Sequence, residues 1–219
     1  MTESPAHFAD ATLGAFTEAL ASRRSVPGGG AAAGSMLAHA AGLAEMVIAF
    51  SHGKKKFAAF ESTLAEAAGR LQRIRETALE LADEDARAFE TLASLWPLAA
   101  DDPRRIEAWP TAVEGAIEAP HRLVMNAAET VDLAARLVGR SSRLLRSDLA
   151  IAGRLAAVAA EAGCWNVEMN LDSLRGLDQG AARALTIENE VRAAIDRAVA
   201  TAGRIDEACR LGGDQPITE

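Results

Sequence analysis

Apolar side chains recur every three to four positions along most of the chain, which is the repeat of an amphipathic α-helix. The repeat predicts helices over residues 10–22, within 25–57, and over 57–94, 111–138, 143–174 and 181–211. No stretch of useful length alternates apolar and polar residues, so no β-strand is predicted. With no internal repeat and no evident linker, we expect residues 1–219 to form one all-α domain, an antiparallel up-and-down bundle of long helices.

An aspartate interrupts the apolar stripe of two predicted helices. Asp85 stands between Leu81 and Phe89 in the third helix, and Asp148 stands three residues before Ile151 in the fifth. A buried carboxylate is costly unless it is paired, so such positions are often functional. We predict that both aspartates face one cavity and act on a substrate, one as a base and the other as a stabilising anion. The alternative is a small rotation of each helix, which would leave the carboxylate at a boundary or paired with an arginine.

A glycine-rich turn, SVPGGG, opens the second predicted helix at Ser25. Ser25 can cap the helix, and Pro27 with the glycines permits a tight turn, which leaves the first backbone N–H groups without helical partners. These N–H groups and the helix dipole together favour a bound anion. The candidate ligand-binding residues of this turn are Pro27, Gly28, Gly29 and Gly30. Neither nucleotide-binding glycine motif fits, because no strand precedes the turn and no Lys-Ser/Thr pair follows it.

The only lysines of the chain are consecutive, at Lys54, Lys55 and Lys56, whereas its other basic side chains are arginines apart from four histidines. This choice indicates a site that needs a compact ammonium group rather than a planar guanidinium. The alternative is a cationic helix end that compensates the helix dipole. Asn166 and Asn170 lie one helical turn apart, so their amides either bind a polar ligand together or are ordinary surface groups.

Composition and charge narrow the class of function. The chain is rich in alanine, has 4% aromatic residues and carries a net charge of −8, so close helix packing is expected and a nucleic-acid partner is not. Its two cysteines fit a reduced compartment, and its first residues lack the plan of a signal peptide. Residues 31–50 are long enough to cross a membrane, but Ser35, His39 and Glu45 favour a buried helix of a cytoplasmic protein. The histidines lack metal-ligand spacing, so no metal site is expected.

A series of short motifs follows in a fixed order along the chain. The series begins with VPGGG, a helix of small residues with Met-Val about twenty residues later, and S-x-GKKK-F. It continues with Asp85-x-x-x-Phe89, Pro120, Glu129, Asp132-Leu133-Ala134, Ser147-Asp148 and Asn166-Val167-x-x-Asn170. Together these motifs resemble the family of formiminotransferase-cyclodeaminase C-terminal domains and methenyltetrahydrofolate cyclohydrolases. The chain departs from the family pattern at Phe57, where the family usually has tyrosine, and at Ser51 and Ala31, where it often has threonine and serine.

The resemblance implies a helical homodimer that hydrolyses 5,10-methenyltetrahydrofolate to 10-formyltetrahydrofolate, with no cofactor besides the folate substrate. Asp85, Asp148 and Lys54 would be the catalytic residues. The substrate-binding residues would be Pro27, Gly28, Gly29, Gly30, Lys55, Lys56, Ser147, Asn166 and Asn170. A carboxylate would stabilise the cationic substrate carbon and take a proton from water. The anionic glutamate tail of the folate would suit a helix N-terminus and lysines.

Two other functions fit the same sequence. A cyclodeaminase would close 5-formiminotetrahydrofolate to the methenyl compound and release ammonia. A non-catalytic helical dimer would keep the fold and bind a folate or a partner protein, and the loss of the family's phenol at Phe57 keeps this alternative open. We also predict a dimer in solution in which the small-residue face of the second helix lies in or near an interface, because small side chains let another helix approach closely: Ala32, Ala33, Ser35 and Met36.

Overall fold

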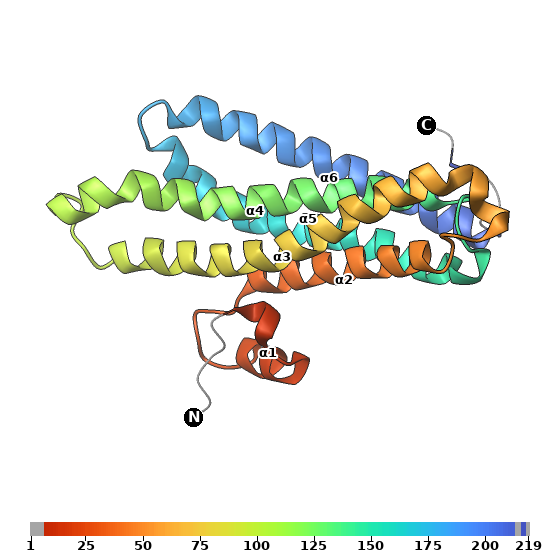
Figure 1. Ribbon diagram of the computed structural model, residues 1–219. Helices are drawn as coiled ribbons and strands as arrows, with labels where there is room; N and C mark the ends of the chain where they lie inside the picture. Colours follow the sequence, from red (N-terminus) through yellow and green to blue (C-terminus); the bar gives the residue numbers. More distant parts are fainter. Residues whose placement is uncertain (1–6, 213–215, 218–219) are drawn as a thin grey trace.

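The structure is a computed structural model that describes residues 7–212 and 216–217. Every regular element in these residues is helical: η1 (Phe8–Asp10), α1 (Leu13–Leu20), α2 (Gly29–Ala49), η2 (Lys55–Phe60), α3 (Glu61–Leu95), α4 (Pro103–Leu137), η3 (Arg143–Leu145), α5 (Arg146–Arg175) and α6 (Gly180–Arg210). Figure 1 shows α2 to α6 running side by side along one long axis, with α1 projecting on the α2 side. The predicted all-α bundle is confirmed.

The close approach of α2 to α3 depends on the small residues of α2. A Cβ atom added to Gly34 would lie 2.7 Å from the carbonyl oxygen of Ala78 and 2.8 Å from the Cβ of Ala82. Ala33, Leu37, Ala40, Ala41 and Ala44 are buried in the core. α2 is long and apolar enough to cross a membrane by length and composition, but 56% of its most apolar window is buried inside the bundle. The small residues therefore serve packing within one chain.

α4 begins earlier than the sequence pattern predicts, at Pro103 rather than Thr111. Asp102 caps the helix by accepting a hydrogen bond from the Arg104 N–H at 2.9 Å, and proline is well suited to the first helical position. The helix continues through Pro110 and Pro120, each of which lacks the N–H that would close a helical hydrogen bond. Residues 103–110, which lie outside the helices predicted from the sequence, are thus part of α4.

The apolar stripe predicted for the core side of α5 lies on its outer side. Ile151, Val158, Trp165 and Met169 are 53%, 47%, 68% and 75% exposed. The buried face consists mainly of small residues, together with Leu149, Val167, Leu171 and Leu174: Ala152, Gly153, Ala156, Ala157, Ala159, Ala160 and Gly163. The neighbouring helices come so close that a Cβ added to Gly163 would lie 2.9 Å from Val124. The sequence prediction failed here because α5 is apolar on two faces and its larger residues face outward.

Candidate functional site

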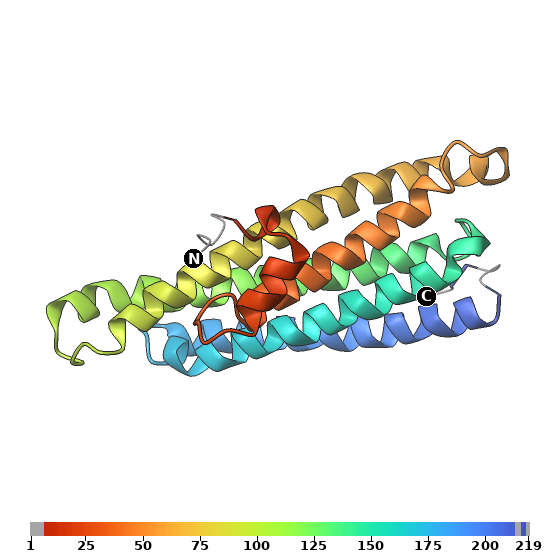
Figure 2. The ribbon, with the colours of Figure 1, turned by 90° about the horizontal axis from the view of Figure 1, so that it is seen from below.

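Asp85 lies in the wall of a cavity of about 280 Å³ between α3, α4 and α5. The lining residues are Asp85, Phe89, Leu92, Trp96, Ala116, Asn166, Met169 and Asn170. α3 and α5 both run past the start of α2, as Figure 2 shows from below, and α4 packs against both of them. Residues of three helices therefore meet at this cavity. Three residues singled out in the sequence, Asp85, Asn166 and Asn170, are therefore brought together.

The glycine-rich turn forms a further side of this site. A Cβ added to Gly30 would lie 1.9 Å from Oδ2 of Asp85, and one added to Gly29 would lie 3.6 Å from Oδ1 of Asn166. Only glycine at position 30 leaves room for the carboxylate in this position. The N-terminus of α2, with Gly28 as its N-cap, thus meets Asp85 and Asn166 directly.

The Asp85 carboxylate has no hydrogen-bond or ion-pair partner among the described residues. Burial raises its pKa from 3.8 to about 6. By contrast, the nearby Asp83 carboxylate accepts a hydrogen bond from the Phe8 N–H at 3.0 Å and lies 3.1 Å from Nδ1 of His7. Asp83 therefore has a structural role, whereas the Asp85 carboxylate has no partner that would neutralise its charge.

The two asparagines of the site differ in their freedom to bind a ligand. Asn170 donates from Nδ2 to the carbonyl oxygens of Asn166, at 2.9 Å, and Ala116, at 3.3 Å. These bonds fix the Asn170 amide, and its oxygen keeps its acceptor capacity. The side-chain amide of Asn166 makes no hydrogen bond to any described residue. Asn166 is therefore available to a polar ligand beside Asp85.

Two aromatic side chains for which the sequence alone indicated no role in binding, Phe89 and Trp96, line the same cavity. The rings of Phe89 and Trp96 meet edge to face, with centroids 5.8 Å apart and planes at 82°. Phe89 is 37% and Trp96 54% exposed, although both are large apolar groups. An exposed aromatic pair beside an unpaired carboxylate suits a flat, cationic ligand. The signal in the sequence was the position of Phe89, one turn after Asp85.

The lysines and Asp148 lie at the opposite end of the bundle. α2 has 21 residues and so spans about 30 Å between the glycine-rich turn and the lysines. Asp148 precedes Asn166 by eighteen residues on α5, which places it about 27 Å away along the helix. At that end the Ser142 N–H donates to Oγ of Ser51 at 2.8 Å, which ties the start of α5 to the end of α2. The prediction that Asp85 and Asp148 face one cavity is wrong within a single chain, because Asp85 lies beside the start of α2 and Asp148 is near the end of α2.

The three ammonium groups are available to a ligand. Lys54, Lys55 and Lys56 are exposed, and none makes an ion pair with a described residue. Nζ of Lys54 lies 5.8 Å from the centroid of Phe50, and Nζ of Lys56 lies 5.5 Å from that of the buried Phe57. Lys54 is the N-cap of η2, where the helix dipole disfavours a cation. Their position argues against simple compensation of a dipole and favours anion binding.

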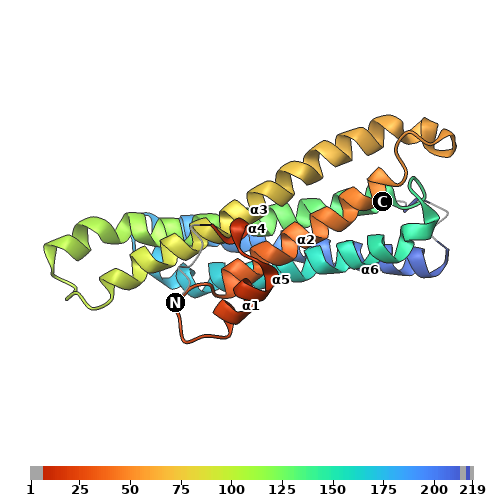
Figure 3. The same ribbon diagram turned by 60° about the horizontal axis from the view of Figure 1, so that its bottom comes forward.

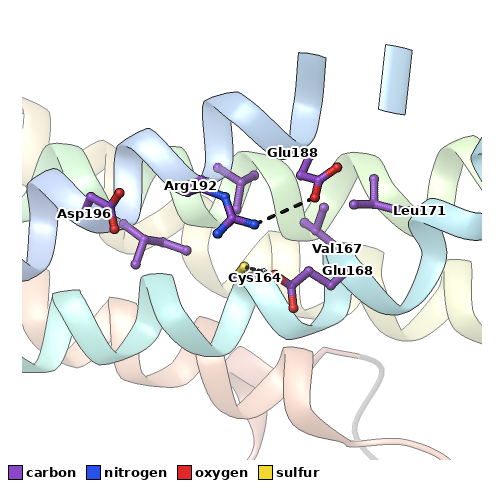
Figure 4. Close-up of a pocket in the computed structure, with 9 residues that line it drawn as sticks. Cys164, Val167, Glu168, Leu171, Glu188, Arg192 and Asp196 are labelled. Atoms are coloured by element: carbon purple, nitrogen blue, oxygen red, sulfur yellow. Dashed lines mark hydrogen bonds and ion pairs between the residues drawn. The ribbon is translucent and has the colours of Figure 1, made fainter. Parts of the chain in front are cut away.

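A further cavity of about 180 Å³ lies between α5 and α6 and is shown in Figure 4. Cys164 lies in its wall and contacts Glu168, with Sγ 3.4 Å from Oε1. Burial and this carboxylate raise the pKa of the thiol to about 11, so the sulfur stays protonated and is a poor nucleophile. Among the residues that the structure describes, no group of three or more histidine, cysteine or acidic side chains could hold a metal ion.

Comparison with known proteins relates the chain to folate enzymes. Residues 12–190 match the family model described as formiminotransferase-cyclodeaminase. A methenyltetrahydrofolate cyclohydrolase of Methylorubrum extorquens is 28% identical over 174 residues, which cover 78% of this chain and 82% of that protein. The formimidoyltransferase-cyclodeaminase of Gallus gallus is 26% identical over 74% of this chain, and the match spans 31% of that longer protein. The crystal structure of formiminotetrahydrofolate cyclodeaminase from Thermotoga maritima has the same fold, with a TM-score of 0.81 at 22% identity over 91% of this chain and 98% of that one.

Proposed function

Because the chain belongs to the formiminotransferase-cyclodeaminase family, we propose that it hydrolyses 5,10-methenyltetrahydrofolate to 10-formyltetrahydrofolate. The observation that carries the proposal is the unpaired, half-buried carboxylate of Asp85 beside the free amide of Asn166 and the exposed Phe89–Trp96 pair. The substrate has a cationic amidinium carbon between N5 and N10, held in a flat ring system. This cavity offers one anion, one amide and an aromatic wall to such a group.

Asp85 is the base of the proposed reaction. Water adds to the amidinium carbon and Asp85 takes a proton from that water, which gives a neutral hydroxy adduct. As the C–N5 bond breaks, protonated Asp85 returns its proton to N5 and the hydroxyl of the adduct loses its proton to solvent, which leaves the formyl group on N10 and releases one proton overall. A base is most effective when its pKa lies near the working pH, and burial raises that of Asp85 to about 6. The same negative charge attracts the cationic carbon before the proton moves. Asn166 orients the substrate, and the aromatic pair contacts its flat face.

A homodimer that completes the site is part of this proposal. The outer face of α5 repeats apolar residues at intervals of four and three, which is the spacing of a helix-packing seam: Ile151, Leu155, Val158, Ala162, Trp165 and Met169. α1 also lacks a partner: it buries none of its residues, Leu13 is 67% exposed, and the helix projects beside α2 and α5 (Figure 3). A second copy of the chain would cover both surfaces.

If a two-fold axis crosses the α5 seam near its middle, the two copies lie in opposite directions along the seam. Each glycine-rich end would then lie beside the lysine end of the partner subunit. Lys54 and Asp148 of the partner subunit would then reach the cavity that contains Asp85. Within a single chain, this cavity lies about 30 Å from the chain's own lysines. Met169 lines the cavity and belongs to the seam as well, so the interface and the site are continuous.

The test is a parallel assay of two substrates with the purified chain. Loss of methenyltetrahydrofolate absorbance above the uncatalysed rate supports cyclohydrolase activity. Release of ammonia from 5-formiminotetrahydrofolate without hydrolysis of the methenyl compound assigns cyclodeaminase activity instead, and several relatives carry that name. If neither substrate reacts but a folate binds with a measurable Kd, the chain is a binding protein and the catalytic proposal fails.

A further inference from the structure

A cavity of about 600 Å³ lies away from Asp85. Its lining residues come from the end of the bundle where α3 begins and α4 and α6 end, and Figure 1 shows these helix ends together. Its lining is strongly basic: Thr63, Asp132, Ala135, Arg136, Arg140, Arg197, Thr201, Arg204 and Ile217. The lining residues comprise four arginines and one aspartate, in a chain whose net charge is −8. The cavity is therefore a positive region in an acidic protein.

Two of the four guanidinium groups are already neutralised. Arg136 donates from Nη1 and Nη2 to the two carboxylate oxygens of Glu66, both at 3.0 Å, and lowers the pKa of that carboxyl. Arg197 donates from Nε to Oδ2 of Asp132 at 3.3 Å. These pairs link α4 to α3 and to α6, so they hold the walls of the cavity in place.

The other two guanidinium groups have no carboxylate partner among the described residues. Nη1 of Arg140 donates to the carbonyl oxygen of Arg136 at 2.9 Å, and Nη2 of Arg204 donates to Oγ1 of the buried Thr201 at 3.0 Å. Each bond orients a guanidinium and uses one of its five N–H donors. The guanidinium groups of Arg140 and Arg204 therefore remain without a counter-charge, in a cavity whose walls the two ion pairs hold in place.

We infer that this arginine cavity binds a small molecule with at least two clustered oxyanion groups, of the diphosphate type. Two uncompensated guanidinium groups match two negative charges, and their planar donors fit phosphate or carboxylate oxygens. The volume falls within the range of small-ligand sites. The arginine cavity shares no residue with the site proposed around Asp85, so either assignment stands if the other fails.

The first test measures the binding of inorganic pyrophosphate to the full chain by calorimetry at fixed ionic strength. Arg140→Gln and Arg204→Gln should each weaken binding about tenfold, because each removes a charge-assisted contact. Arg73→Gln is the matched control, since Arg73 is exposed on α3 outside the cavity, and it should bind like the wild type. Equal binding by all three variants, or equal loss in all three, would overturn the inference.

A second comparison identifies the source of the oxyanions. Tripolyphosphate and citrate, tested at equal ionic strength, distinguish a phosphate ligand from a polycarboxylate. The compound that binds more tightly identifies the class of the ligand. If neither compound binds, the inference is overturned. A chain truncated after Gly212 loses two acidic residues, Asp214 and Glu219, together with Ile217. It should bind pyrophosphate at least as tightly as the full chain. If truncation abolishes binding, the C-terminal segment rather than the arginine cluster forms the site.

Discussion

The α-carbon of Gly30 lies against the carboxylate of Asp85, so that a Cβ at position 30 would stand 1.9 Å from Oδ2. Gly30→Ala should therefore push the carboxylate out of its place and lower kcat by roughly a hundredfold, as small misplacements of a reacting group do. Gly203→Ala on α6 is the control, since nothing lies within 4 Å of its added Cβ. It should leave the rate unchanged and raise the melting temperature slightly. Equal rates for both variants would remove Gly30 from the site.

Asp85→Asn should separate catalysis from stability. The amide keeps the shape of the side chain but cannot accept the proton, so kcat should fall by roughly 10²- to 10⁴-fold. The melting temperature should hold or rise, because a buried charge with no partner is lost. Asp83→Asn should show the reverse pattern, with lower stability and near-normal turnover, because it weakens the contacts to His7 and Phe8. Steady-state kinetics and calorimetry on both variants check this; normal turnover in Asp85→Asn would place the base elsewhere.

The raised pKa of Asp85 predicts how both activity and stability change with pH. The base must be ionised, so kcat/KM should rise with an apparent pKa of about 6 and then level off. The effect of Asp85 on stability has the opposite sign: its contribution to the free energy of unfolding falls as pH rises. The folded state holds this proton more tightly than the unfolded state, so between about pH 4 and 6 Asp85 makes the free energy of unfolding fall as pH rises, by roughly 2 kcal/mol. Denaturant titrations of the wild type and Asp85→Asn at pH 4 and at pH 6 check this: the free energy of unfolding should fall by that amount more in the wild type than in the variant.

Charge on the outer face of α5 should separate the proposed subunits. Trp165→Glu places a carboxylate in the seam, and we expect a single-chain mass by sedimentation at micromolar concentration, with at least a tenfold loss of activity. Leu185→Glu is the control, because Leu185 is also an exposed apolar residue, at 58% against 68% for Trp165, but lies on α6 outside the seam. It should keep the oligomeric state of the wild type. A wild-type chain that is already monomeric and active would contradict the dimer directly.

Mixing two inactive variants should restore activity if each site draws on two chains. Asp85→Asn damages the glycine-rich end and Lys54→Gln the lysine end, so a mixed dimer has one site with both defects and one with neither. Random reassociation of equal amounts should recover about a quarter of the wild-type rate. Recovery that does not exceed the sum of the separate variants would show that each chain uses only its own residues.

The sequence predicted the helical class and the partial burial of Asp85, because both depend on local periodicity. Leu64, Leu71 and Leu81 are buried as the repeat on α3 requires, and Asp85 follows them on the same face. Asn166 and Asn170 join the same cavity, as their spacing of one helical turn allows.

The rest depended on distances that periodicity cannot provide. Nothing in the repeat shows which of the two apolar faces of α5 turns inward. The position of Asp148 depended instead on the length of α5, which places it about 27 Å from Asn166 along the helix. The motifs at the two ends of α2 read as one set along the sequence, although a rigid helix of 21 residues holds them apart. The aromatic pair of Phe89 and Trp96 also required the structure, since Trp96 looked only like the end of a helix.

The length of α2 acts as a molecular ruler for the proposed dimer. One inserted residue would advance the lysines by 1.5 Å and turn them by about 100° around the helix axis relative to the glycine-rich turn. The two-fold axis would impose the same error on both sites at once. We therefore expect substitutions along α2 to be tolerated far better than insertions or deletions, so that the count of residues between Gly30 and Lys54 is itself a determinant of activity.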